Sequence, residues 1–276
     1  MTCHLAALRK SYHRVRVRSV SFGDDIISKG EEMASKQKTS PVVLGEDWLA
    51  LIVGLILTAL VWIGVIEKVL IEEDLELGVI GNSTPRGLCG SGLIDVCGQM
   101  LKAGMLAPDG RLRTGNMLNT GLSASLRKRL RLDPDGQPEC VLYENGERAI
   151  RLTQRDVREL QLGVGAIRAG ISILLKQAGL VPGDLEQVLI AGGFGSFIRR
   201  DNAQRIGLIP HEVPHKKIRF VGNVALSGAK WVVISGDARR EAERLARAAA
   251  HIELSQDPDF ALEFAMAMQF PGDTAG

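Results

Sequence analysis

The distribution of apolar residues changes abruptly after Glu72. Upstream, residues 1–46 show no sustained apolar period and contain a basic stretch at residues 14–18 and a polar stretch at residues 29–40. Downstream, strand-like apolar runs alternate with amphipathic helix-like runs as far as the carboxyl end, and glycines separate them. Such alternation is typical of an α/β domain. We therefore expect a basic, poorly ordered arm at residues 1–46 and a folded α/β region at residues 81–276.

A long apolar run, WLALIVGLILTALVWIGVI, separates these two regions. It spans residues 48–66, nineteen residues without a charge, between Glu46-Asp47 and Glu67-Lys68. At about 1.5 Å per residue, a helix of this length matches the roughly 30 Å apolar core of a bilayer. Because the run has no polar face, it predicts one continuous transmembrane helix over residues 47–67 that stands apart from the globular region. A buried helix or a pair of strands in a soluble protein is the alternative.

Within the α/β region, the pattern predicts a series of elements. A glycine-rich turn at residues 87–92 opens a helix at residues 93–103, and a β-rich stretch follows at residues 112–152 with turns at Pro134 to Gly136 and at Asn145-Gly146. Strand-like segments are expected at residues 187–190, 218–221 and 251–254, and shorter helices at residues 202–206, after Asn223, and at residues 238–250 and 260–268.

The strongest helix signal begins after Thr153. Thr153 and Asp156 have the spacing of a capping box, in which each side chain bonds the backbone of the other residue. From Val157 to Leu175, apolar residues recur at helical spacing, and Gly179 supplies an end. We therefore predict one long amphipathic helix between Thr153 and Gly179.

Composition narrows the functional classes. The net charge is only +2 and aromatic residues make up 4% of the chain, so we expect no nucleic-acid surface. The four cysteines, Cys3, Cys89, Cys97 and Cys140, lie far apart, without the paired or clustered spacing of a zinc or iron–sulfur site. We interpret them as reduced thiols and expect neither a metal site nor an iron–sulfur cluster in this chain.

A glycine-rich segment is the first candidate for ligand binding. In VLIAGGFGS, at residues 188–196, an apolar strand ends in Gly192, Gly193 and Gly195, which can adopt positive φ and let a ligand approach the backbone closely. A turn that serves packing alone has a similar composition, so both interpretations stand.

Four further residues have two interpretations each. Asn223 either lines the same cleft or satisfies a turn, and Cys89 is either a reactive thiol at a helix start or a small packed side chain. Asp95 and Asp156 invite a catalytic or metal-binding interpretation, but their positions in the first turns of predicted helices favour structural roles.

Several motifs resemble a known family in their order and spacing. They are RGLCGSGLIDV at residues 86–96, the helix at residues 152–175, LIAGGFGSFI at residues 189–198, IRFVGNVALSGAK at residues 218–230, and the closing ELSQDPDFALEFAMAMQF. Together they resemble the ATP-dependent reductive activators of corrinoid-dependent enzymes, over about 190 of the 276 residues. That family belongs to the acetate kinase, sugar kinase, Hsp70 and actin superfamily. The resemblance therefore implies an actin/Hsp70-like ATPase lobe.

The resemblance also implies a function and a site. The activity would be ATP-coupled reduction of a cobalt(II) corrinoid to cobalt(I) for methyl transfer, with Mg–ATP as ligand and a corrinoid protein or corrinoid-dependent methyltransferase as partner. Gly192, Gly193 and Gly195 match the turn on the adenosine side. Gly90, Ser91 and Gly92 match a turn at a helix start, which would offer N–H groups and a hydroxyl to phosphate.

Two parts of the family pattern are not found in this sequence. They are the amino-terminal ferredoxin-type cysteine cluster and the Asp-x-Gly-Thr-Thr turn that holds Mg–phosphate. We therefore expect an incomplete ATPase lobe whose missing parts a partner chain supplies. The other expected partners are a ferredoxin-type electron donor and a second copy of the chain in a homodimer. The alternatives are a non-catalytic docking module for a corrinoid protein and an inactive fused or truncated remnant.

The upstream region carries a second resemblance. Residues 33–66 resemble the start and first membrane helix of bacterial sulfate exporters, a match too short to carry over transport. Basic residues before the apolar run would place its amino end inside and the folded region outside, away from ATP. This orientation conflicts with the use of ATP, and two explanations remain open. Either the apolar run joins a cytoplasmic domain through a gene fusion, or it is a genuine single-pass anchor with the reverse orientation.

Overall fold

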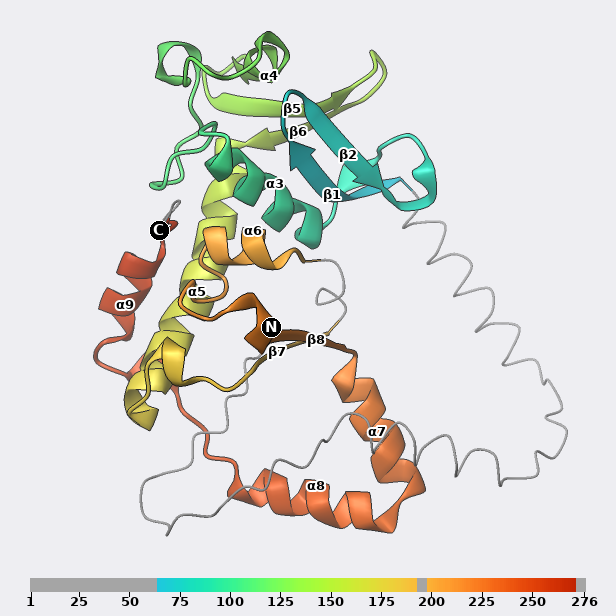
Figure 1. Cartoon of the computed structure of the whole chain (residues 1–276), viewed down its shortest axis with the longest axis vertical. Helices are drawn as coiled ribbons and strands as arrows, with labels where there is room; N and C mark the ends of the chain where they lie inside the picture. Colours follow the sequence, from blue (N-terminus) through green and yellow to red (C-terminus); the bar gives the residue numbers. More distant parts are fainter. Residues whose placement is uncertain (1–63, 193–197, 272–276) are drawn as a thin grey trace, which may run out of the picture. The chain divides into compact units, whose positions relative to one another are not determined.

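The structure is a computed structural model that describes residues 64–192 and 198–271 (Figure 1). Its first sheet has three strands in the order β2-β1-β3. Strand β1 (Val65–Ile71) pairs antiparallel with β2 (Leu75–Val79) and parallel with β3 (Gly87–Leu88). The folded region therefore begins before residue 81, where the sequence analysis had placed its start.

The start of β1 corrects the predicted carboxyl end of the apolar helix. Val65 and Ile66 belong to the strand, not to a helix that ends near residue 67. A register shift between Ile66 and Lys68 lets both Ile66 and Val69 face the core despite their odd spacing, so the strand lacks the simple alternation by which strands are recognised. Residues 47–63 of the predicted helix lie outside the described residues. Among the residues that the structure describes, no helix has the length and apolar character needed to cross a bilayer.

The second sheet is antiparallel and leads into the longest helix. Its strands are β4 (Leu130–Leu132), β5 (Pro138–Glu144) and β6 (Ala149–Thr153), preceded by α4 (Ala124–Arg129). The predicted turns are confirmed, since Gly136 and Gly146 adopt φ of 77° and 85° between successive strands. The predicted β-rich stretch is thus confined to residues 130–153.

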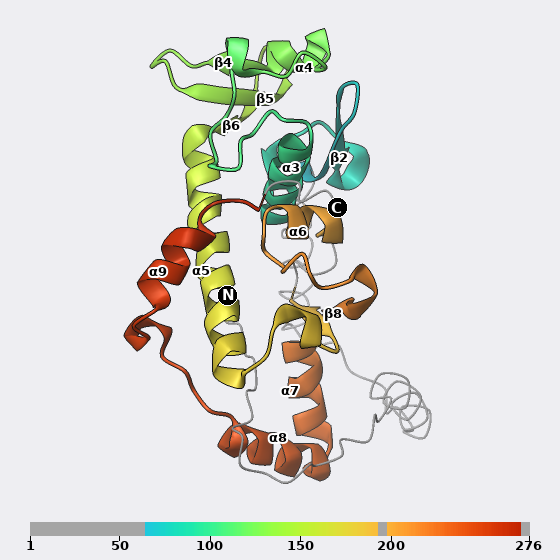
Figure 2. The ribbon, with the colours of Figure 1, turned by 60° about the vertical axis from the view of Figure 1, so that its left-hand side comes forward.

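Helix α5 (Gln154–Ala178) confirms the strongest helix prediction. The Thr153 side chain accepts a bond from the Asp156 N–H, and the Asp156 carboxylate accepts one from the Thr153 N–H at 2.8 Å. The helix ends at Gly179, which is left-handed at φ 65°. Helix α9 (Phe260–Ala267) lies alongside α5 (Figure 2), and Arg168 fastens the segment after it by donating to the carbonyls of Ala267 and Gln269.

The third sheet consists of two parallel strands, β7 (Val188–Ala191) and β8 (Ile218–Gly222). Helix α6 (Arg200–Arg205) lies between them in sequence, and α7 (Val224–Ile234) and α8 (Gly236–Ala248) follow β8. The predicted strand at residues 251–254 is wrong. Its alternation arises because Leu254 faces Gly170 of α5, and the segment ends in a 3-10 turn, η6 (Leu254–Gln256). Other 3-10 turns are η1 (Ile80–Asn82), η2 (Gly115–Met117), η3 (Pro182–Asp184) and η5 (His215–Lys217).

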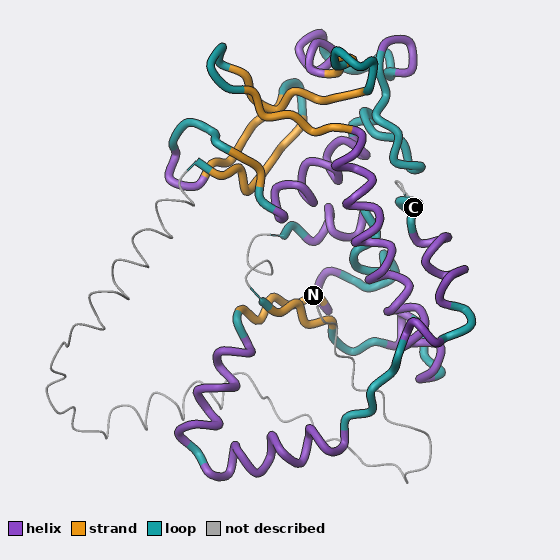
Figure 3. Tube along the Cα trace, turned by 180° about the vertical axis from the view of Figure 1, so that it is seen from behind, coloured by secondary structure: helices purple, strands orange, loops and turns teal. Residues whose placement is uncertain are grey.

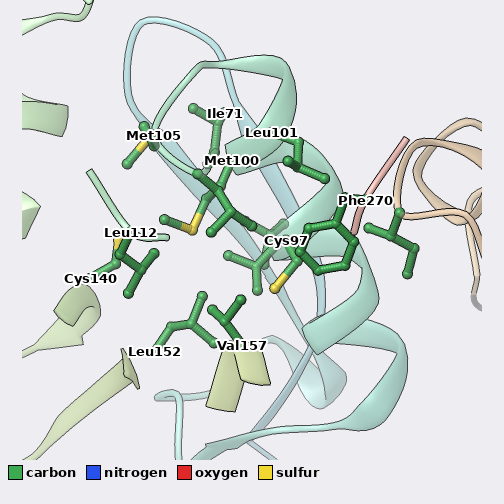
Figure 4. Packing of buried hydrophobic residues seen from close by; sticks show 14 of the residues in the cluster. Ile71, Cys97, Met100, Leu101, Met105, Leu112, Cys140, Leu152, Val157 and Phe270 are labelled. Carbon is green, nitrogen blue, oxygen red and sulfur yellow. The ribbon is translucent and has the colours of Figure 1, made fainter. Parts of the chain in front are cut away.

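The hydrophobic core joins the first sheet to α5 through α3 (Gly90–Lys102). Cys97 and Met100 of α3 are completely buried and lie near Leu152 and Val157 at the β6–α5 junction (Figure 4). Phe270, which follows α9, enters the same cluster and is 2% exposed. The core therefore fixes α3 against both β1 and the amino-terminal part of α5.

Candidate nucleotide site and its supporting network

The first glycine-rich turn forms the beginning of α3. The helix begins at Gly90, three residues before the predicted start, and Cys89 is its N-cap. The Cys89 sulfur accepts a hydrogen bond from the Gly92 N–H at 3.4 Å and lies 2.9 Å from the Ser91 hydroxyl oxygen. Cys89 is thus a capping side chain, which accounts for its position without a reactive role.

Close packing explains two of the three candidate phosphate residues at this turn. A Cβ at Gly92 would overlap the carbonyl oxygen of Ile66, so only glycine lets α3 approach β1 this closely. Ser91 is 4% exposed and its hydroxyl is engaged by Cys89. Gly90 is the exposed member of the three, and its backbone is the most accessible to a ligand.

The second glycine-rich turn is described only at its beginning. Gly192 follows β7 directly, adopts φ of 99°, and donates its N–H to the Gly222 carbonyl at 2.8 Å. A Cβ at Gly192 would meet no atom within 4 Å, so space is open beside this strand end. Gly193 and Gly195 lie outside the described residues. The prediction that this turn faces the same cleft as Gly90 to Gly92 is therefore untested.

Asn223 caps a helix. It is the N-cap of α7, and its side-chain oxygen accepts a bond from the Leu226 N–H at 3.1 Å. The interpretation of Asn223 as a residue that satisfies a turn is confirmed by this bond. A contact between Asn223 and a nucleotide remains a prediction.

A buried polar network connects the helices that follow the two glycine-rich turns. Asp95 and Gln99 of α3 are each 1% exposed, and Asn202 of α6 is fully buried. The Asn202 amide nitrogen donates to Asp95, while the Asn202 oxygen accepts from Gln99 at 2.9 Å and from Arg205 at 2.8 Å. Gly98 makes room for this contact, since a Cβ there would overlap the Asn202 side chain.

The same two side chains of α3 satisfy the backbone of β1. Asp95 accepts the Val69 N–H at 2.9 Å and Gln99 accepts the Ile71 N–H at 3.4 Å. Residues four apart on a helix are separated by about 6 Å along its axis, and residues two apart on a strand by about 6.6 Å. This match lets one helix provide acceptors to two N–H groups of the strand.

Burial raises the pKa of Asp95, and the bonds from Val69 and Asn202 and the charge of Arg199 offset this only in part. Arg199 lies 4.0 Å from the Asp95 carboxylate and also pairs with Asp201 at 3.1 Å. In the described part of the chain, no group of three or more His, Cys, Asp or Glu residues could hold a metal ion. The bonds that Asp95 accepts from Val69 and Asn202 give it a structural role, and the capping box gives Asp156 one as well.

Two of the cysteines are core residues. Cys97 and Cys140 are both fully buried, and desolvation raises the pKa of the Cys140 thiol to about 12 and that of Cys97 further still. These thiols stay protonated near neutral pH and behave as small apolar side chains. Cys3 lies outside the described residues.

The sequence analysis did not identify Gln99, Asn202 and Arg199. A signal was present on α3, because Asp95 and Gln99 are four residues apart among apolar neighbours on its buried face. Such a pair indicates that something outside the helix supplies partners. The sequence does not show that the partners come from residues more than a hundred positions later.

Comparison with known proteins places this arrangement in a family. Residues 60–275 match the model of the C-terminal domain of RACo, the ASKHA domain. The corrinoid activation enzyme RamQ of Eubacterium limosum is 34% identical over 212 residues, which is 75% of this chain and 35% of RamQ. The Co(II) methylated amine-specific corrinoid protein reductase of Methanosarcina barkeri is 27% identical over 54% of this chain and 22% of the reductase.

A solved structure points to the same family of proteins. A reductive activator for corrinoid, iron-sulfur protein superposes with a TM-score of 0.66 at 32% identity, and the match covers 76% of this chain and 33% of that one. The chain thus spans about a third or less of the length of these relatives. Because the family match extends from before β1 to beyond α9, this chain belongs to the family of the C-terminal ASKHA domain of RACo.

Proposed function

We propose that this chain is the carboxy-terminal, ATP-binding part of an activator that reduces a cobalt(II) corrinoid protein to cobalt(I). The observation that carries the proposal is the family match over residues 60–275, together with relatives named for corrinoid activation and corrinoid protein reduction. Its partner would be a corrinoid protein or a corrinoid-dependent methyltransferase, and its electron donor a ferredoxin-type protein. By these relatives, the domain would work in the cytoplasm.

The adenosine side of the proposed site is the strand end at Gly192. Its positive φ and the open space beside it support an approach of adenosine to Gly192, Gly193 and Gly195. On the phosphate side, the exposed Gly90 would provide a backbone N–H at the positive end of α3, and the buried Ser91 and Gly92 would hold that end in place. Bound Mg–ATP would supply the free energy of hydrolysis that drives a conformational change.

The test follows the oxidation state of cobalt by the visible spectrum of the corrinoid. The full chain, the region that precedes the matched domain in RamQ, a cobalt(II) corrinoid protein and a low-potential reductant are mixed with and without ATP. We expect cobalt(I) to appear only with ATP, and to appear more slowly with Gly192→Val, whose β-branched side chain is incompatible with φ of 99°. Gly163→Ala, at an open position in α5, is the matched control. ATP-independent reduction would contradict the proposal.

A non-catalytic docking module is the second candidate. The burial of Ser91 and Gly92 favours a docking module, because it leaves fewer groups at the start of α3 that could bind phosphate. ATP turnover in the reconstituted mixture separates the two candidates, since a docking module would bind the corrinoid protein without hydrolysing ATP.

A further inference from the structure

A pocket lies beside the carboxyl half of α5. It is formed by α5, by residues 180–182 ahead of β7, by residues 207–212 between α6 and β8, and by Pro271, which follows the helix α9 that packs along α5 (Figure 3). Its volume of about 480 Å³ is in the range of small-molecule sites. Its two loops lead into the amino ends of the parallel strands β7 and β8, whereas Gly192 follows the carboxyl end of β7. The pocket is therefore separate from the candidate nucleotide site.

Arg168 of α5 lines this pocket and uses only part of its hydrogen-bonding capacity. Its Nη1 donates to the carbonyls of Ala267 and Gln269 at 2.8 and 2.6 Å. Among the described residues, its Nε and Nη2 have no hydrogen-bond partner. Both nitrogens remain open to solvent, since Ser83 Oγ is the one buried side-chain nitrogen or oxygen without a partner in this part of the chain. Gly207 leaves room for the guanidinium group, because a Cβ there would lie 2.9 Å from Nε.

The neighbouring charges do not neutralise Arg168. Lys176, which also lines the pocket, pairs with Asp259. Glu212 lies 3.5 Å from His211 and attracts Arg168, but in the part of the chain that the structure describes no carboxylate lies within ion-pair distance of the Arg168 guanidinium. Burial lowers the pKa of Arg168, and the charge of Glu212 offsets this only in part. A half-buried cation without a counter-ion favours a negatively charged ligand.

Beside these charges, the pocket has an apolar wall. Leu175 and Ile209 line it and are each 4% exposed, so the packing of the fold holds them in place. Leu180 and Val181 line it as well, but they are 43% and 60% exposed. Their apolar surface is in contact with solvent, and a ligand with an apolar tail would cover it favourably. The pocket therefore combines an unused edge of donors with an apolar wall.

We propose that this pocket binds a small carboxylate with an apolar tail. The Nε–H and Nη2–H groups of Arg168 lie on one edge of the planar guanidinium and can donate to both oxygens of one carboxylate. The tail would lie along Leu180 and Val181. A phosphate group fits less well, because Glu212 would repel its second charge and the apolar wall would stay uncovered. This inference is independent of the proposed function.

The test titrates the full chain with 4-phenylbutyrate, with the uncharged 4-phenylbutyramide and with inorganic phosphate, in the absence of ATP and corrinoid. Calorimetry and ligand-observed NMR measure the Kd and the stoichiometry. We expect saturable one-to-one binding of the carboxylate, at least about tenfold tighter than that of the amide or of phosphate, because only the carboxylate combines charge with an apolar tail. The Tm should rise with the carboxylate concentration. Equal affinity for acid and amide, tighter binding of phosphate, or no saturable binding would overturn the proposal.

Two variants locate the binding site. Arg168→Lys keeps the charge but loses the planar fork, so it should weaken carboxylate binding. Because Arg168 also fastens the segment after α9, the deciding variant is Val181→Asp, which removes no side-chain hydrogen bond. Its negative charge at the exposed rim should weaken carboxylate binding at least about tenfold.

Val233→Asp is the matched control. Val233 is 76% exposed on α7 and does not line the pocket, so this change should leave the Kd of the carboxylate unchanged. Circular dichroism of all three variants should equal that of the parent chain. Carboxylate binding that Val181→Asp leaves unchanged, or that Val233→Asp weakens equally, would show that the carboxylate binds elsewhere and would overturn the proposal.

Discussion

Asp95 on α3 and Asn202 on α6 are hydrogen-bonded to each other in the core, where each is at most 1% exposed. The two residues lie on the helices that follow the two glycine-rich turns. Their bond therefore sets the distance between these helices, although Asn202 lies outside the motifs that carry the family resemblance. An unpaired polar atom at this depth costs more than a surface hydrogen bond contributes, so the network should be sensitive to small changes.

Asp95→Asn should destabilise the protein by about 1–3 kcal/mol, even though it preserves size. The new amide nitrogen would face either the Val69 N–H or the Asn202 amide nitrogen, so two donors meet in either orientation. Asn202 cannot reverse its amide without losing the bonds that its oxygen accepts from Gln99 and Arg205. Urea unfolding measures the effect, and Asp135→Asn, in an exposed turn, should change the free energy of unfolding by less than about 0.5 kcal/mol. Equal stability of the two variants would show that the network rearranges.

Gly92→Ala should destabilise the protein by about 1–3 kcal/mol, because the added methyl group has no room beside the Ile66 carbonyl and forces α3 away from β1. Gly163→Ala offers the opposite case in α5, where no atom lies within 4 Å of the new Cβ. That change should stabilise the protein by up to about 1 kcal/mol through helix propensity. Thermal unfolding of both variants tests the argument, which fails if the two substitutions shift Tm in the same direction.

Alkaline pH should destabilise the protein in part through Cys140. Burial raises the pKa of its thiol from an ordinary 9.0 to about 12 in the folded protein. Between these values the unfolded chain loses the proton and the folded protein keeps it, so this contribution to stability is intact below pH 9 and lost as pH rises toward 12. Relative to Cys140→Ala, the parent chain should lose roughly 1 kcal/mol per pH unit in this window. A difference between the two proteins that is the same at pH 7, 9 and 10 would contradict the assignment.

Local signals were sufficient to predict the parts of the fold that depend on neighbouring residues. Thr153 and Asp156 satisfy each other within one helical turn, and Gly136 and Gly146 reverse the chain within a few residues, so these features are visible in short windows. The end of the apolar run was not visible in this way. Val65 and Ile66 are apolar and continue the run, and they form a strand because β2 and β3 pair with them.

The candidate site could be predicted only in part, for a similar reason. Gly192 was identified from the glycine-rich end of an apolar strand, and Gly90 and Gly92 from the family resemblance, but neither source separates close packing from ligand contact. At Gly92 the decisive neighbour is the Ile66 carbonyl, and at Asp95 it is Asn202. Both depend on contacts between segments distant in sequence, which a single sequence does not display.

The chain by itself should bind ATP weakly and should not restore cobalt(I) in a corrinoid protein, even with a chemical reductant present. Without the Asp-x-Gly-Thr-Thr turn, the charge on the β- and γ-phosphates would be met by backbone N–H groups alone, whereas phosphoryl transfer depends chiefly on positioned electrostatic stabilisation. Calorimetric titration with Mg–ATP and visible spectra of a cobalt(II) corrinoid protein measure the two effects. The full chain is required, because a fragment that begins at Gly81 would lose β1, whose N–H groups bind Asp95 and Gln99. Tight binding together with ATP-dependent reduction by this chain alone would show that its own residues replace the missing turn.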